Sequence, residues 1–315
     1  MTPQDRLSYS GDLRPVIERV CSSFDIGRLA GQSLIKIGYE DCNVVITTDQ
    51  GKFVAKVFSG KRTPEEIQRY GDIMKSVVAA GVQHPSLHQV TGKSIYQDGE
   101  TGLSLVLMDF IDGETFLTLD RAPRAEERRL IIEQAAKVNA VDLHPLPVFD
   151  SWAIPNIKMM VERVRPFIES EDMRLVEEVV RRFDSIPLPE LPHCFVHGDF
   201  TKANVLKGRD GRIYILDFSV SNWYPRIQEL AVIVANLLHD GEQGLPLQKR
   251  CDLVADEYSE FIKLTSEERK HLFDYSLAGV AMEFMGSHQE KFINGNDTEE
   301  TGYWLRLGRE GLRSA

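Results

Sequence analysis

The chain has 315 residues, of which 42% are hydrophobic and 27% charged, and this composition excludes wholesale disorder. Lys and Arg number 37 against 48 Asp and Glu, which gives a net charge of -11. A nucleic-acid partner is therefore not expected, because binding a phosphate backbone requires clustered cations. The acidity fits either a solubility device or a cationic small-molecule partner.

The length is too great for one ordinary hydrophobic core and predicts two. The four cysteines are widely spaced and form no C-x-x-C pair, so neither a zinc site nor a disulfide framework is expected. The opening segment lacks the pattern of a signal peptide, and the longest apolar run, at 230–238, is too short to span a bilayer. We therefore expect a reduced, cytoplasmic protein with no membrane partner, and the oligomeric state stays open.

The first third of the chain is rich in strand signals. Residues 43–58 contain two β-branched or apolar runs around a Thr-Asp-Gln-Gly turn, which predicts a hairpin. A helix is expected next, because Thr63 offers an N-cap, Pro64 suits the first helical position, and Glu66 completes a capping-box pattern. Further strands are predicted at 94–97 and 103–110.

From residue 111 onward the pattern is mainly helical. The spacing of apolar residues predicts helices around 125–143, 157–183, 227–238, 251–263 and 267–292. Two short strands are expected between them, at 194–196 and 213–216. The polar stretch at 295–312 is expected to form a mobile loop before a final helix. The predicted fold class is α+β, with a strand-rich lobe over 1–110 and a larger, mainly helical lobe over 111–315.

The most informative segment is HGDFTKAN, residues 197–204, followed closely by ILDF at 215–218. It places Asp199 and Asn204 in a loop between apolar strands and Asp217 at the end of the second strand. Phosphoryl transfer from ATP requires a carboxylate to orient and deprotonate the acceptor hydroxyl, oxygen ligands for magnesium, and a cation on the phosphates. Asp199 is a candidate for that carboxylate, and Asn204 and Asp217 offer suitable oxygen ligands.

This signature resembles that of the aminoglycoside phosphotransferase and choline kinase-like family, which shares the protein-kinase fold. The resemblance covers nearly the whole chain. GYEDCNVVITTDQGKFVAKVF resembles the nucleotide-lobe hairpins, LVLMDFIDGETF the hinge, VNAVDLH the helix before the catalytic loop, and LDFSVSNWYPRIQELA the metal loop and the helix after it. It implies a two-lobed protein-kinase-like fold with a small antiparallel-sheet N-lobe and a larger, mainly helical C-lobe.

The resemblance also implies roles for individual residues. Asp199 matches the catalytic base, and His197 matches the residue that braces the catalytic loop. Asn204 and Asp217 match the magnesium ligands. Lys56 matches the strand lysine on the α- and β-phosphates, although an ordinary strand lysine would occupy the same position by snorkelling.

Three further assignments follow from the same resemblance. The hinge, whose backbone would hydrogen-bond adenine, is matched by Met108, Asp109, Phe110 and Ile111. Glu229 stands where most members have an Asp that buttresses the catalytic loop. Glu66 is the nearest candidate for the helix glutamate that pairs with Lys56, and a plain capping box explains Glu66 equally well.

The implied function is an ATP- and Mg²⁺-dependent phosphotransferase, with GTP as an alternative donor, acting on a hydroxyl of a small molecule. The acidity favours a cationic acceptor such as an aminoglycoside, an amino alcohol or a hydroxy amino acid, and Glu283 is the acid of interest because its neighbours are apolar. The alternative is a nucleotide-binding pseudokinase that serves as a regulatory or scaffold module. Segment 31–43 has only two glycines, and Ser219-Val220 departs from the family pattern, which keeps this alternative open.

Overall fold

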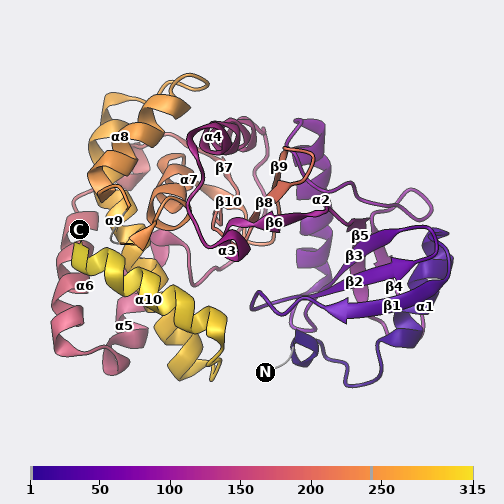
Figure 1. Cartoon of the computed structure of the whole chain (residues 1–315). Helices are drawn as coiled ribbons and strands as arrows, with labels where there is room; N and C mark the ends of the chain where they lie inside the picture. The colour runs from indigo at the N-terminus through magenta and orange to yellow at the C-terminus, as the bar shows by residue number, and fades with distance from the viewer. Residues whose placement is uncertain (1–2, 242–243, 315) are drawn as a thin grey trace. The chain divides into compact units, whose positions relative to one another are not determined.

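The computed structural model describes residues 3–241 and 244–314 (Figure 1). The chain forms two compact units. The first comprises the chain up to Lys75 together with His84–Gly113, and the second comprises Ser76–Gln83 together with the chain from Glu114 onward. The predicted α+β fold class is confirmed, whereas the assignment of nucleotide and acceptor to separate lobes stays a prediction.

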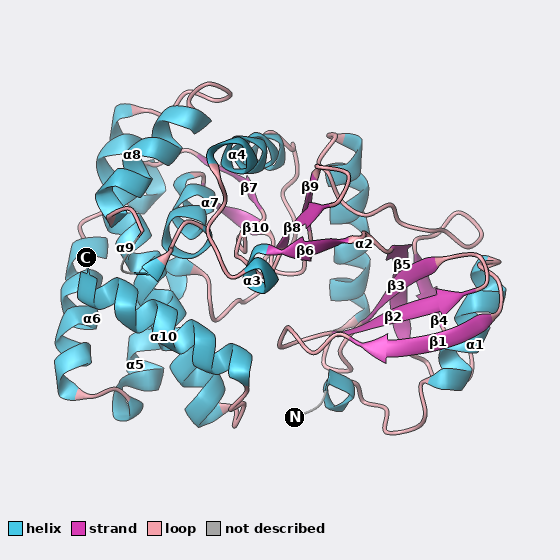
Figure 2. Cartoon of the chain, viewed as in Figure 1, coloured by secondary structure: helices cyan, strands magenta, loops and turns pink. Residues whose placement is uncertain are grey.

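The first unit is built on an antiparallel sheet of five strands, drawn as magenta arrows in Figure 2. Their order across the sheet is β1 (Leu29–Leu34), β2 (Cys42–Thr48), β3 (Lys52–Val57), β5 (Ser104–Asp109) and β4 (Ile95–Gln97). The hairpin predicted at 43–58 is confirmed as β2 and β3, and the two later strands are confirmed as β4 and β5. Strand β1 and helix α1 (Arg14–Phe24) were not predicted from the sequence, although Val16, Ile17 and Val20 recur at helical spacing.

Successive side chains along each strand point to opposite sides, so this sheet has two faces. One face packs against α1 and forms the core of the unit, with buried residues that include Val16, Ile17, Val20, Val44, Ile46, Ala55, Val57, Leu105 and Leu107. Lys56 lies between Ala55 and Val57, so it belongs to the opposite face. On that face Phe58 packs edge-on against Tyr70 of α2 (Pro64–Ala79), with ring centroids 5.3 Å apart.

Helix α2 begins as the sequence predicts. The Glu66 amide donates to Thr63 Oγ1 at 3.2 Å, and the Thr63 amide donates to Glu66 Oε2 at 2.8 Å, which forms the reciprocal capping box. The helix ends two residues before Gly81, whose φ of 76° suits glycine.

The second unit is mainly helical. Its helices are α3 (Phe116–Leu119), α4 (Ala125–Asn139), α5 (Ile157–Val164), α6 (Ser170–Phe183), α7 (Ile227–Val232), α8 (Leu247–Tyr258), α9 (Ser266–His288) and α10 (Glu299–Ser314). The single helix predicted over 157–183 is two helices, because a 3₁₀ turn at Arg165–Phe167 contains a proline. Helices α7 and α9 continue into π-helical turns at Ile233–Leu237 and Gln289–Ile293.

Two small sheets complete the second unit. One has the order β6 (Gly113–Thr115), β8 (Val205–Gly208), β9 (Ile213–Ile215), and the other pairs β7 (His193–Val196) with β10 (Asn222–Pro225). The strands expected at 194–196 and 213–216 are therefore confirmed. In the described part of the chain, no helix has both the length and the apolar character needed to cross a membrane. All four cysteines are buried free thiols.

The loop predicted over 295–312 is wrong from Glu299 onward, where the chain forms α10. Its buried residues are Thr301, Trp304, Leu307, Gly308, Gly311 and Leu312. These recur at helical spacing, so the charged residues between them lie on the outer face. The segment is therefore an amphipathic helix despite its polar composition. It packs against α9 (Figure 1).

Gly308 allows this close packing. A Cβ atom added to it would lie 2.5 Å from the amide nitrogen of Phe284 in α9, whereas a Cβ at Gly302 would meet nothing nearer than Arg306 at 3.6 Å. Gly308→Ala is expected to lower the free energy of unfolding by about 1–3 kcal/mol through overpacking against backbone. Gly302→Ala, in the same helix, is the control and is expected to raise it by up to about 1 kcal/mol. Urea denaturation of both variants tests this, and equal effects would contradict it.

Candidate active site

The HGD loop, residues 197–204, begins where β7 ends, and His197 fixes its first turn. The amide of Asp199 donates to Nδ1 of His197 at 3.0 Å, so Nε2 carries the proton and donates to the carbonyl oxygen of Leu216 at 2.8 Å. Phe200 and Phe218 pack edge-on against the imidazole, with centroids 5.1 and 4.4 Å away. Burial lowers the pKa of His197 to about 4, so the ring is neutral near pH 7. His197 thus ties Asp199 to the strand end that precedes Asp217.

Glu229 of α7 holds the same turn from the other side. Its carboxylate accepts the amides of His197 and Gly198 at 2.8 and 3.0 Å. Gly198 has a φ of 85°, which a residue with a side chain would adopt only with strain. Burial raises the pKa of Glu229 to about 7 even though both hydrogen bonds act to lower it.

The β8–β9 hairpin brings Asn204 and Asp217 to the same end of two strands. Val205 is paired with Ile215, and the amide of Leu216 donates to the carbonyl of Asn204 at 2.8 Å. The side-chain amide of Asn204 donates to the Asp199 carboxylate at 2.5 Å and to the Asp199 carbonyl at 3.2 Å. Because the NH₂ group faces Asp199, the amide oxygen points away and is the atom suited to a metal ion.

Asp217 has an unusual backbone conformation. Its φ is 60°, in the left-handed region that residues other than glycine enter only at an energetic cost. Its Oδ1 atom accepts hydrogen bonds from the amide and the hydroxyl of Ser219, at 3.2 and 2.6 Å. The serine that departs from the family pattern therefore orients the carboxylate of Asp217.

Acidic groups gather around Asp199, which is half-buried. Burial, followed by the charges of Asp150, Asp217 and Glu283, raises the pKa of Asp199 well above its ordinary value. Of these acids, Glu283 stands out in the sequence because its neighbours are apolar, whereas no local pattern marks Asp150. Such a cluster attracts cations, whether metal ions or an acceptor with a positive charge.

Glu283 is connected to the HGD loop through Asn236 in the π-helical turn. The side-chain amide of Asn236 donates to Glu283 Oε1 at 2.7 Å, and its oxygen accepts the amide of Lys202 at 2.8 Å. Burial raises the pKa of Glu283 to about 7 despite the bond from Asn236. Sequence patterns could not reveal Asn236, because it lies in an apolar run and its partners are distant in the chain.

Five other acids of the C-terminal half form ion pairs near the surface. The pairs are Asp256–Arg269, Glu257–Arg128, Glu260–Arg129, Asp274–Arg182 and Asp297–Lys291. Trp223, which the sequence placed after the metal loop, stacks on His144 with ring centroids 3.3 Å apart.

Lys56 is paired with an acid that sequence reasoning did not identify. Its Nζ atom lies 2.7 Å from Oδ2 of Asp41, and both side chains are buried. Glu66 forms the capping box with Thr63 and, among the described residues, makes no ion pair with Lys56. The prediction that Glu66 pairs with Lys56 is therefore wrong. The register of the β2–β3 hairpin could have indicated Asp41, because Asn43 is paired with Lys56 and Asp41 lies two residues before Asn43.

The hinge residues lie at the end of β5 and just beyond it. Met108 is paired with Val54, the Asp109 amide donates to the Ser86 carbonyl at 3.0 Å, and the Phe110 amide donates to the Lys52 carbonyl at 3.4 Å. The amides of Asp109 and Phe110 are thus already engaged. Adenine recognition by this segment would rely on the amide of Ile111 for a donor.

The donor set fits magnesium bound together with phosphate. Within residues 3–241 and 244–314, no group of three or more His, Cys, Asp or Glu side chains could hold a metal ion by themselves. Asn204 and Asp217 supply two oxygen donors, and magnesium bound to nucleotides takes its remaining ligands from phosphate and water. The two residues therefore suit a metal that arrives with its nucleotide.

Comparison with known proteins agrees with this geometry. Residues 31–260 match the model of the phosphotransferase enzyme family, and the chain belongs to that family. Homoserine kinase of Zymomonas mobilis is 25% identical over 283 residues, covering 86% of this chain and 84% of that protein. Hydroxylysine kinase of Mus musculus is 22% identical over 299 residues, covering 82% and 79%. A solved amicoumacin kinase, in complex with AMP-PNP and Ca²⁺, superimposes with a TM-score of 0.69 at 12% identity, covering 96% of this chain and 93% of that one.

The chain is accordingly a small-molecule kinase, an enzyme that transfers a phosphoryl group to an alcohol group of its acceptor. The predicted family membership is confirmed. The alternative of a pseudokinase module is set aside, because the relatives that cover most of the chain are named as kinases.

The raised pKa of Glu229 predicts a pH dependence of stability. Between its ordinary value of 4.5 and about 7 the folded state binds more protons than the unfolded state, so the free energy of unfolding falls as the pH rises. The slope from this group is at most about 1.4 kcal/mol per pH unit. Glu229→Gln cannot titrate, and its stability is expected to fall less between pH 5 and pH 7.

Urea denaturation at several pH values measures this difference. Glu162→Gln serves as the control, because the Glu162 side chain is 75% exposed and should leave the wild-type slope unchanged. Parallel curves for the wild type and Glu229→Gln would contradict the prediction.

Proposed function

We propose that the chain transfers the γ-phosphoryl group of ATP, in a Mg²⁺-dependent reaction, to a hydroxyl of a small amine-bearing molecule. The observation that supports this most directly is the joint placement of Asp199, Asn204 and Asp217 by the HGD loop and the β8–β9 hairpin. A hydroxyl is a poor nucleophile until a carboxylate orients it and accepts its proton.

In this proposal Asp199 orients the acceptor hydroxyl and takes its proton. Asn204 and Asp217 would hold Mg²⁺, which when bound neutralises charge on the transferring phosphates. Lys56 binds the phosphates of the donor. Transfer is direct and in line, because no side chain in the HGD loop resembles an activated nucleophile that could form a phosphoenzyme.

The acidic surroundings of Asp199 support an acceptor that carries an ammonium group. Asp150 and Glu283 both act on Asp199, and neither belongs to the metal-ligand pair. An ammonium group beside them would offset their mutual repulsion. The two relatives named above are kinases of homoserine and hydroxylysine, both of which bear an amine and a hydroxyl. Aminoglycosides and amino alcohols share this chemistry and belong in the same screen.

Asp199→Asn tests the role of the base. The amide keeps the size of the side chain but cannot accept the proton, so turnover is expected to fall by about 10²–10⁴-fold while nucleotide binding is nearly retained. A coupled ADP-release assay over hydroxy amino acids, amino alcohols, aminoglycosides and sugars provides the measurement. Asp210→Asn, in the β8–β9 turn, is the control and should behave as wild type. Unchanged turnover in Asp199→Asn would refute the assignment.

Asp217→Ala tests the metal ligand. Removing this carboxylate is expected to abolish most of the gain in nucleotide affinity that Mg²⁺ provides, with little effect on metal-free nucleotide binding. Calorimetric titration of ATP with Mg²⁺ and with EDTA measures both quantities. An equal Mg²⁺-dependent gain in the wild type and in Asp217→Ala would exclude Asp217 as a ligand.

A further inference from the structure

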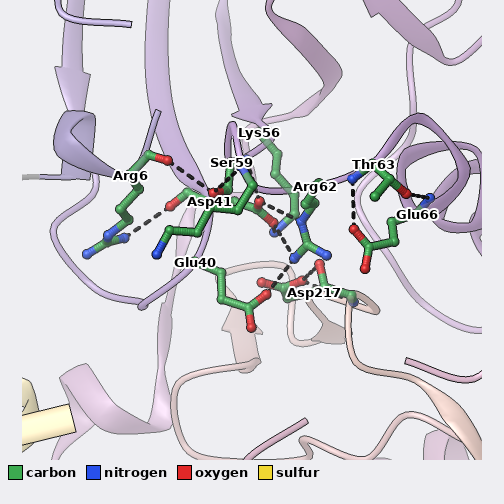
Figure 3. A network of polar contacts seen from close by, with 11 residues as sticks. Arg6, Glu40, Asp41, Lys56, Ser59, Arg62, Thr63, Glu66 and Asp217 are labelled. Carbon is green, nitrogen blue, oxygen red and sulfur yellow. Dashed lines mark hydrogen bonds and ion pairs between the residues drawn. The ribbon is translucent and has the colours of Figure 1, made fainter. Parts of the chain in front are cut away.

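Two cations and one carboxylate lie together at the end of β3, on the face of the sheet that turns away from α1, and Lys56 and Asp41 are buried there. We name Asp41, Lys56 and Arg62 the Asp41 cluster (Figure 3). The side chains of Lys56, Asp41 and Arg62 are 3%, 2% and 11% exposed. Asp41 Oδ2 lies 2.7 Å from Lys56 Nζ and accepts Arg62 Nη2 at 3.0 Å, and Asp41 Oδ1 accepts Arg62 Nε at 2.8 Å.

The local fold brings these three residues together. The β2–β3 register places Cys42 opposite Val57, so Asp41 emerges beside the end of β3. Arg62 lies in the short connection between β3 and α2. The Thr63–Glu66 capping box fixes the end of that connection and therefore the direction in which Arg62 leaves the backbone.

The carboxylate of Asp41 is held from several sides. Besides the two cations, its Oδ1 atom accepts the amide of Ser59 at 2.9 Å. Its backbone carbonyl accepts Arg6 Nη1 at 3.0 Å, and the hydroxyl of Ser59 donates to the Arg6 carbonyl at 3.0 Å. Lys56, Arg62 and Ser59 thus fix the carboxylate, and Arg6 holds the backbone of the same residue. A carboxylate fixed in this way positions the cations bound to it.

The cluster contains two cations on one carboxylate. Arg62 also pairs with Glu40 at 2.6 Å, but the Glu40 side chain is 57% exposed, and such a pair is weak and screened by salt. Lys56 and Arg62 bind the same carboxylate oxygen, so their charged ends lie close enough for neighbouring oxygens of one polyphosphate to reach both. Arginine suits phosphate oxygens because its guanidinium group carries five N–H donors, of which Asp41 binds two and Glu40 a third.

We infer that Arg62 is a second phosphate-binding cation of the donor site, and that Asp41 is the residue that positions Arg62 and Lys56 for the nucleotide. This rests on the proposed function, in which Lys56 binds the donor phosphates. Helix α2 contributes no ion pair from Glu66 to Lys56; instead Tyr70 presents its ring face 5.8 Å from Lys56 Nζ. The lysine is therefore positioned by the loop before β2 and not by that helix acid.

Nucleotides with different numbers of phosphates test this inference. Arg62→Gln is expected to weaken binding of ATP and ADP by at least about tenfold, while adenosine binds as it does to the wild type. The KM for ATP should rise by a similar factor, with kcat and the KM for the acceptor changing little. Arg28→Gln is the control, because Arg28 lies on the same unit, is 94% exposed and pairs with an aspartate. Calorimetry and steady-state kinetics supply these values.

Asp41 is tested with a graded pair. Asp41→Asn leaves both cations without their counter-ion, so it should lower the melting temperature and weaken ATP binding more than Arg62→Gln does. Asp41→Glu restores the charge and should recover part of the ATP affinity. If Asp41→Asn does not fold, Arg62→Gln still tests phosphate binding by Arg62, and Asp41→Glu still tests the positioning role of Asp41.

Two results would overturn the inference. One is a folded Arg62→Gln variant that binds ATP as tightly as the wild type, and the other is a loss of affinity equal for ATP and adenosine, which would indicate a structural ion pair only. Either result in an enzyme whose wild type turns over ATP leaves the proposed function intact. A wild type that binds neither ATP nor GTP would overturn both proposals together.

Discussion

The geometry of the second unit depends on how the backbone between β7 and Asp199 is held. Two buried side chains hold it. The neutral imidazole of His197 accepts a hydrogen bond from the Asp199 amide and donates one to the Leu216 carbonyl. The carboxylate of Glu229 accepts hydrogen bonds from the amides of His197 and Gly198. Without these bonds three amides would be buried with no acceptor, at a cost that a marginally stable protein cannot bear. Asp199 and the strand end before Asp217 therefore keep a fixed relation.

The two units surround an aspartate with opposite kinds of neighbours: cations in the first unit and acids in the second. Asp41 is saturated by two cations and a backbone amide, so its charge is compensated within the protein. Asp199 is surrounded by further acids, and burial and repulsion together raise its pKa. The first arrangement fixes two cations on one carboxylate, whereas the second gathers carboxylates around Asp199 and attracts cations.

Much of the site was predictable because its residues are close in sequence. Asp199, Asn204 and Asp217 fall within twenty residues, and their residue types, their spacing and the family resemblance together predicted phosphoryl transfer. Glu66 was ambiguous because one pattern, an acid three residues after a threonine, fits both a cap and an ion pair. Glu66 forms the cap, because the Thr63 amide lies within reach of its carboxylate at the start of α2. The prediction of a loop over 295–312 was wrong because it relied on the polar composition of the segment, whereas the helical spacing of its apolar residues indicates α10.

Sequence patterns were enough to predict the α+β class and the principal strands and helices, and to propose Asp199, Asn204 and Asp217 as phosphoryl-transfer residues. These depend on local periodicity, turn chemistry and short spacings, which the chain displays without folding. Only the tertiary structure decided that Asp41 holds Lys56 and Arg62, that Asn236 joins Glu283 to the HGD loop, and that Asp150 acts on Asp199. Strand register and helix packing create these contacts between residues far apart along the chain, and no local pattern records them.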